Sequence, residues 1–192
     1  MQNANKRLFI ILIVLVGFTS FLKADDKRVI PLDLYLVVDC SESINSVKNE
    51  ALAWVYSNVV DRLLIEGDKV TIWSAGDRAQ IIHNGEISAS GGKEEIRDLL
   101  QNLAANGKSA DFSGALRDLE PRVSGTGQSR LPYTVLVTSS AARLENALSG
   151  SSRPLLRWSR SEKYSGWQII VAATDITPKV RQAAASYISS QQ

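Results

Sequence analysis

Three oxygen-bearing side chains stand at every second position directly after an apolar run. The run is "LYLVV" (34–38), and Asp39, Ser41 and Ser43 come directly after it. Carboxylate and hydroxyl oxygens are the ligands of hard cations, because Mg²⁺ takes six oxygens and keeps several waters among them. The same side chains have a simpler use. Asp39 and Ser41 can close the turn after a strand, and Ser43 can cap a following helix.

Strands and helices are predicted to alternate around this motif. Short apolar runs rich in β-branched and aromatic residues predict strands at 34–38, 70–75, 79–83, 133–138 and 167–173. Apolar residues at helical spacing predict helices at 46–64, 93–104 and 111–120, the last ended by Pro121, and a final helix from Thr177 to about 188. The order indicates an α/β fold with a doubly wound, mainly parallel, Rossmann-like sheet and helices on both faces.

The turn "GD" at 76–77 predicts a hairpin between the second and third strands, which makes the third strand an antiparallel edge. In doubly wound sheets, ligands bind at the carboxyl ends of the parallel strands. Asp39 ends the first predicted strand, so the motif lies where a binding site is expected.

These segments together resemble the von Willebrand factor type A (VWA) domain. "DCSES" (39–43) matches the D-x-S-x-S signature of that family, and "VTIWSAGDRAQII" looks like its second strand, hairpin and short edge strand. "NGKSADFSGALRDLE" resembles its second metal loop and the helix after it. "YTVLVTSSA" stands where the family has a strand followed by Thr-Asp-Gly. The resemblance covers 32–142 in register and implies one VWA-like domain over residues 25–192.

The resemblance implies a metal-ion-dependent adhesion site (MIDAS) and a role in protein-protein interaction or adhesion. Position by position, Asp39, Ser41 and Ser43 match the first loop, Ser109 matches the second-loop hydroxyl, and Asp111 is an auxiliary carboxylate. The implied cofactor is Mg²⁺ or Mn²⁺, with a Glu or Asp side chain of a protein partner completing the coordination shell. Ser109 or Asp111 has an alternative role as the cap of the third helix.

The third loop departs from the family pattern, because Ser139 stands where the family has an aspartate. At an effective dielectric constant near 20, one charge at about 4 Å is worth roughly 4 kcal/mol before desolvation and screening reduce it. We therefore expect a MIDAS-like site of weakened metal affinity. The alternative hypothesis is a metal-independent VWA scaffold or assembly protein, which binds through its surface and the basic loop 143–166.

That loop interleaves basic and aromatic side chains, as the rim of a protein-binding surface does. Its candidate partner-binding residues are Arg153, Arg157, Trp158 and Arg160. The simpler interpretation is a short helix followed by a solvated loop.

The N-terminal segment predicts export. Lys6 and Arg7 precede an apolar stretch at 8–22, and Ala24 offers a small residue at the cleavage site. We expect a signal peptide at 1–24 and a periplasmic or extracellular protein. The rival interpretation is an uncleaved anchor, which would hold the domain at a membrane. Cleavage removes three cations and no acid, which changes the net charge from +2 to −1, so composition does not suggest a nucleic-acid partner.

The sequence argues against an enzyme. His83 is the single histidine and no G-x-S-x-G motif accompanies it, which disfavours a serine-hydrolase triad. A phosphoryl-transfer enzyme with Asp39 as its nucleophile is a third hypothesis, but Ser41 stands where such enzymes need a second acid. Cys40 is the single cysteine, so no internal disulfide forms, and we expect a small buried side chain rather than a reactive thiol.

Overall fold

The computed structural model describes residues 28–125, 129–139 and 168–173. Five strands form one sheet in the order β3-β2-β1-β4-β5. Their bounds are β1 (Leu32–Asp39), β2 (Lys69–Ala75), β3 (Ala79–Glu86), β4 (Leu131–Thr138) and β5 (Gln168–Ala173). β3 pairs antiparallel with β2, and the other three pairings are parallel.

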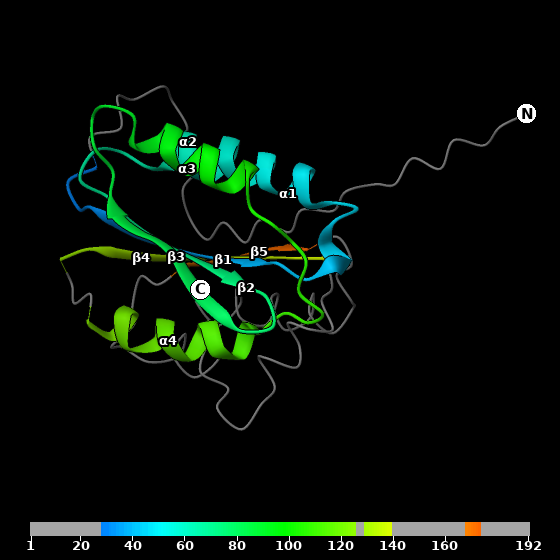
Figure 1. Cartoon of the computed structure of the whole chain (residues 1–192). Coiled ribbons are helices and arrows are strands. Elements are labelled where there is room, and N and C mark those ends of the chain that lie inside the picture. The colour runs from blue at the N-terminus through cyan, green and yellow to red at the C-terminus, as the bar shows by residue number, and fades with distance from the viewer. Residues whose placement is uncertain (1–27, 126–128, 140–167, 174–192) are drawn as a thin grey trace, which may run out of the picture.

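Helices lie on both faces of this sheet (Figure 1). One face carries α1 (Lys48–Val55), α2 (Asp61–Leu63) and α3 (Gly92–Gln101), and the opposite face carries α4 (Phe112–Gly125). Two short turns complete the first connection: a 3₁₀ turn, η1 (Glu42–Ile44), and a π-helical turn, η2 (Tyr56–Val60). The predicted doubly wound α/β fold with an antiparallel edge strand is confirmed.

The central strand β1 is buried along its whole length. Leu34, Leu36 and Val38 pack towards α1 and α3, while Tyr35 and Val37 pack towards α4 with Trp73, Phe112 and Leu116. A strand covered on both faces carries apolar side chains at consecutive positions, which is the pattern that predicted it. Because β1 lies between two parallel neighbours, the position of its last residue, Asp39, is fixed by the core.

The predicted helix at 46–64 is interrupted in the structure. α1 begins at Lys48, and η2 widens the helix by one residue before α2 ends at Leu63. In a π-turn the backbone bonds run from residue i to i+5, so residues five apart return to one side. Val55, Val59 and Val60 are all buried. The wider turn brings Val55 and Val60 to the same side of the helix, facing the core.

The prediction that Pro121 ends the third helix is wrong, because α4 continues to Gly125 with Pro121 inside it. Proline removes one backbone donor, but apolar contacts past it compensate for that loss. Val123 is buried beside Leu119 and Leu116, so the core-facing stripe of α4 extends beyond the proline. The packing of α4 against the core therefore outweighs the tendency of proline to end a helix.

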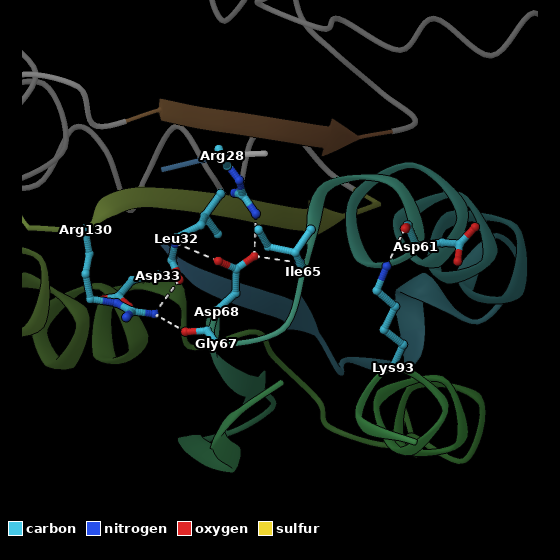
Figure 2. Close-up of polar contacts among 9 residues, drawn as sticks. All are labelled: Arg28, Leu32, Asp33, Asp61, Ile65, Gly67, Asp68, Lys93 and Arg130. Atoms are coloured by element: carbon cyan, nitrogen blue, oxygen red, sulfur yellow. Dashed lines mark hydrogen bonds and ion pairs between the residues drawn. The ribbon is translucent and has the colours of Figure 1, made fainter. Parts of the chain in front are cut away.

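Two ion pairs lie at the amino-terminal end of the strands, and we call Arg28, Asp33, Asp68 and Arg130 the amino-end cluster (Figure 2). Arg28 Nη2 contacts Asp68 Oδ2 at 2.6 Å, and this carboxylate also accepts the backbone N–H groups of Leu32 and Ile65, each at 2.8 Å. Asp68 is fully buried.

The second ion pair of the cluster joins Arg130 to Asp33. Arg130 also donates to the backbone oxygens of Leu32 (2.9 Å) and Gly67 (3.0 Å). The two ion pairs thus hold together the starts of the strands and the segments that lead into them.

Several sequence predictions fall outside the described residues. They are the signal peptide or anchor at 1–24, the basic loop 143–166 with Arg153, Arg157, Trp158 and Arg160, and the final helix from Thr177. Within the described ranges, no helix has the length and apolar character needed to cross a bilayer.

Candidate metal centre

The predicted site residues gather where the parallel strands end. Asp39 ends β1 opposite Ala75, the last residue of β2, and Thr138 ends the neighbouring strand β4. Four segments meet there, and we call 39–43, 76–78, 107–111 and 138–139 together the carboxyl-end face. The parallel register of the central strands brings them to one edge of the sheet.

Asp39 is completely buried, and both oxygens of its carboxylate accept hydrogen bonds. Its Oδ1 accepts from the backbone N–H (2.9 Å) and the hydroxyl (2.6 Å) of Ser41, and its Oδ2 accepts from the hydroxyl of Thr138 (3.0 Å). The turn-closing interpretation of Asp39 and Ser41 is therefore present in the structure. The Thr138 contact ties the end of β1 to the end of β4.

A series of serine hydroxyls continues from this carboxylate to the surface. Ser41 Oγ lies 2.9 Å from Ser43 Oγ, which lies 3.1 Å from Ser139 Oγ. Ser41 is fully buried, whereas Ser43 is exposed. Ser43 does not cap α1, since the N-cap position is Val47 and has no side-chain cap bond. Its hydroxyl instead joins the first loop to the third.

Backbone pairing holds the second loop against the first. The N–H of Glu42 donates to the oxygen of Gly107 (2.8 Å), and the N–H of Gly107 donates to the oxygen of Cys40 (3.0 Å). Ser109 lies two residues further on, and its N–H and Oγ donate to Asp77 Oδ1 at 3.0 and 3.2 Å. Ser109 thus lies on the carboxyl-end face but bonds to Asp77 rather than to the first-loop hydroxyls.

Asp111 occupies the N-cap position of α4. Its Oδ1 accepts from the N–H of Gly114 (2.8 Å), and its Oδ2 accepts from the N–H of Ala79 (3.2 Å). A Cβ at Gly114 would lie 2.2 Å from Asp111 Oδ2, so only glycine leaves room for this cap. The capping alternative accounts for the contacts of Asp111, and its role as an auxiliary metal ligand stays a prediction.

Two residues that bond to the predicted site residues were not themselves predicted, namely Thr138 and Asp77. Thr138 could have been found from the threonine that ends the matching family strand. Asp77 was seen only as a turn residue, because its contact with Ser109 joins positions 32 apart in the chain.

Cys40 lies beneath the site and is buried. Burial, followed by the negative charge of Asp39, raises the pKa of its thiol to about 11. The thiolate is the reactive form, so a protonated thiol is inert near neutral pH. The expectation of a small buried cysteine is confirmed.

The spacing of the hydroxyl oxygens fits a small divalent cation. Neighbouring ligands of an octahedral Mg²⁺, each about 2.0–2.1 Å from the ion, stand about 2.9 Å apart. The oxygen pairs Ser41–Ser43 and Ser43–Ser139 are 2.9 and 3.1 Å apart. In the described part of the chain, no three His, Cys, Asp or Glu side chains gather as a metal cluster. An ion bound here would depend on serine oxygens beside one buried carboxylate.

No family model and no curated protein matches this sequence. Solved structures do match its fold. A von Willebrand factor type A protein from Catenulispora acidiphila superposes with a TM-score of 0.55 at 16% identity, over 82% of this chain and 37% of that one. The fold is that of a von Willebrand factor type A domain.

Two further structures share this VWA fold. The ArnB paralog VWA2 from Sulfolobus acidocaldarius has a TM-score of 0.52 at 13% identity, over 82% of this chain and 39% of that one. Proximal thread matrix protein 1 from the mussel byssus has a TM-score of 0.51 at 16% identity, over 74% and 37%. The chain therefore spans about two fifths of the length of these structures. At such identities the likeness concerns the fold.

Proposed function

We propose that this chain is an exported VWA module that binds a protein partner through a divalent cation at the carboxyl-end face. The observation that carries the proposal is the continuous series of oxygens from buried Asp39 through Ser41 and Ser43 to Ser139. Its serine oxygens stand 2.9 and 3.1 Å apart, close to the spacing of neighbouring Mg²⁺ ligands. When bound, the ion would offer a positive centre to an acidic side chain of the partner.

The residues of the chain have separate roles in this proposal. Asp39 supplies the negative charge, and Thr138 and the Ser41 N–H hold its carboxylate in place. The hydroxyls of Ser41 and Ser43 turn lone pairs towards the ion, since a hydroxyl both donates and accepts. Ser109 supplies a further hydroxyl from the second loop, and exposed Ser43 marks the side open to the partner.

Exposed charges of both signs lie on the face. Arg78 and Lys108 are exposed next to Asp77 and Ser109 in the chain, and in the described part of the chain neither takes part in an ion pair. Glu42 and Asp77 are exposed acids on the same face. The two cations would help to steer an acidic segment towards the site at low salt, and the ion would supply the net positive charge.

We also propose that the face binds rather than catalyses. His83, the single histidine, pairs with Ile72 in the middle of β2 and faces Glu95 of α3, with 3.6 Å between Nδ1 and Oε1. His83 lies four residues from Ala79, the end of β3 that borders the face. Export is supported by the leader-like segment at 1–24.

One observation favours the metal-independent scaffold as a second candidate. The bond between Ser43 and Ser139 links the first and third loops without an ion, so the loops can hold their arrangement alone. A partner would then recognise the shape of the face.

The test is a titration of Mg²⁺ and of Mn²⁺ into the full chain, followed by thermal unfolding. An ion at about 100 times its Kd adds about 2.7 kcal/mol to the free energy of unfolding, so the melting temperature should rise. Ser43→Ala should abolish the rise, and it should lower the metal-free melting temperature only slightly, because the bond it removes between Ser43 and Ser139 is exposed. Ser46→Ala, on the same loop, is the matched control. No rise at millimolar metal would favour the scaffold.

A further inference from the structure

The turn between β2 and β3 is built into the carboxyl-end face. A Cβ at Gly107 would lie 3.1 Å from Gly76 Cα and 3.2 Å from the nitrogen of Asp77, so the second loop lies directly on this turn. The N–H of Asp111 also donates to the oxygen of Gly76 (2.9 Å). Asp77 is therefore held beside the second loop by backbone contacts and not by its own side chain alone.

The carboxylate of Asp77 fixes the direction of the Ser109 hydroxyl. Oδ1 accepts both the N–H and the hydroxyl hydrogen of Ser109. Because the single hydroxyl hydrogen is committed to Asp77, the lone pairs of Ser109 Oγ point elsewhere. Within 28–125, 129–139 and 168–173, Asp77 takes part in no ion pair, and its side chain is exposed.

The charge of Asp77 matters because the third loop lacks one. Ser139 occupies the position at which the fold family has an aspartate, which leaves Asp39 as the single carboxylate within the hydroxyl series. Asp77 brings a carboxylate to the same face from the β2–β3 turn, one hydrogen bond away from a proposed ligand.

We propose that Asp77 is a positioning residue of the metal site. It orients the hydroxyl of Ser109 towards the ion and supplies, from the β2–β3 turn, negative charge that Ser139 does not. This inference rests on the proposed function. A ligand that donates to a carboxylate becomes a better electron-pair donor, and loss of such an outer partner typically weakens metal affinity about 10–100-fold.

The experiment measures the Kd of Mg²⁺ by calorimetry on the full chain, together with the metal-free melting temperature. Asp77→Asn keeps an amide oxygen that can accept from Ser109 and removes the charge. We expect about a tenfold weaker Kd with an unchanged metal-free melting temperature. Asp61→Asn is the matched control, since Asp61 is an exposed acid at the start of α2, and it should bind as the unaltered chain does.

A second variant distinguishes charge from structure. Ser139→Asp restores the third-loop carboxylate, so we expect it to bind most tightly. Ser139→Asp combined with Asp77→Asn should return to the affinity of the unaltered chain, and Asp77→Asn alone should bind most weakly. Equal affinities with and without Asp77→Asn, in both backgrounds, would overturn the inference. So would an affinity loss accompanied by an equal fall in metal-free stability.

The design also separates the inference from the proposed function. If the unaltered chain binds no Mg²⁺, the proposed function fails. The role of Asp77 is then tested in the Ser139→Asp variant. Weaker Mg²⁺ binding on adding Asp77→Asn to that variant supports the role. An unchanged Kd, or no Mg²⁺ binding by Ser139→Asp, refutes it.

Discussion

Aspartates lie at both ends of β1, and the two ends surround them with different partners. At the amino end, Asp33 and the neighbouring Asp68 receive the guanidinium groups of Arg130 and Arg28. At the carboxyl end, Asp39 receives hydroxyls and one backbone N–H. A guanidinium has donors only and stays committed to its carboxylate, whereas a hydroxyl can turn a lone pair towards a cation. The same residue type thus stabilises the fold at one end and is suited to ligand binding at the other.

The largest expected effect is at the amino end, where Asp68→Ala removes the partner of Arg28 and two backbone bonds. Removing one member of a buried ion pair costs about 3–5 kcal/mol, because the other charge stays buried without compensation. We expect this loss in urea unfolding at pH 7, with an unchanged melting-temperature increment on adding Mg²⁺. Asp61→Ala should change stability by less than about 0.5 kcal/mol. A comparable loss in both variants would show that the effect is not specific to the buried ion pair.

An intermediate effect is expected at the carboxyl end from Ser139→Asp. The added carboxylate should tighten Mg²⁺ binding about tenfold, or about 1.4 kcal/mol. It should also lower metal-free stability, because two carboxylates approach each other without an ion between them. Calorimetry and thermal unfolding measure the two quantities. Ser139→Asn provides the uncharged control of the same shape, and equal tightening in that variant would show that charge is not the cause.

The smallest expected effect is on the pH dependence of stability, and it comes from the thiol of Cys40, which lies between the core and the face. Burial and Asp39 raise the pKa of its thiol to about 11 in the folded chain, from 9.0 as the ordinary value. The unfolded chain therefore loses this proton first, and stability should fall as the pH rises from about 9 to about 11. Below pH 9 the contribution is fully present. Unfolding across this range should show a shallower decline for Cys40→Ala, and parallel curves would contradict the raised pKa.

The sequence was sufficient for the five strands and the hairpin, because consecutive apolar runs and the Gly76-Asp77 turn are local patterns. It also placed Asp39, Ser41 and Ser43 correctly at the end of β1. It failed at η2 and at Pro121, where the packing of Val60 and Val123 into the core outweighs local helix preferences.

The candidate site was only partly predictable for a physical reason. Side chains close to Asp39 in the chain were found, since strand and turn fix their direction. The bond between Ser109 and Asp77 joins residues 32 positions apart, and the bond between Ser43 and Ser139 joins residues 96 positions apart. Both depend on how the sheet brings its strand ends together. For Asp111 the sequence offered two roles, and in the folded chain it caps α4 through Gly114 and also accepts from Ala79 at the start of β3.

The hydroxyl contact between Ser43 and Ser139 has a consequence for ionic size. Loops already joined before binding have little conformational entropy left to lose, so they need not fold around an ion. Mg²⁺ demands near-octahedral geometry, whereas Ca²⁺ takes six to eight oxygens in flexible geometry. Loops joined in advance, with serine oxygens 2.9 and 3.1 Å apart, suit the ion with the stricter geometry. The contact would therefore favour the smaller, more rigidly coordinated ion.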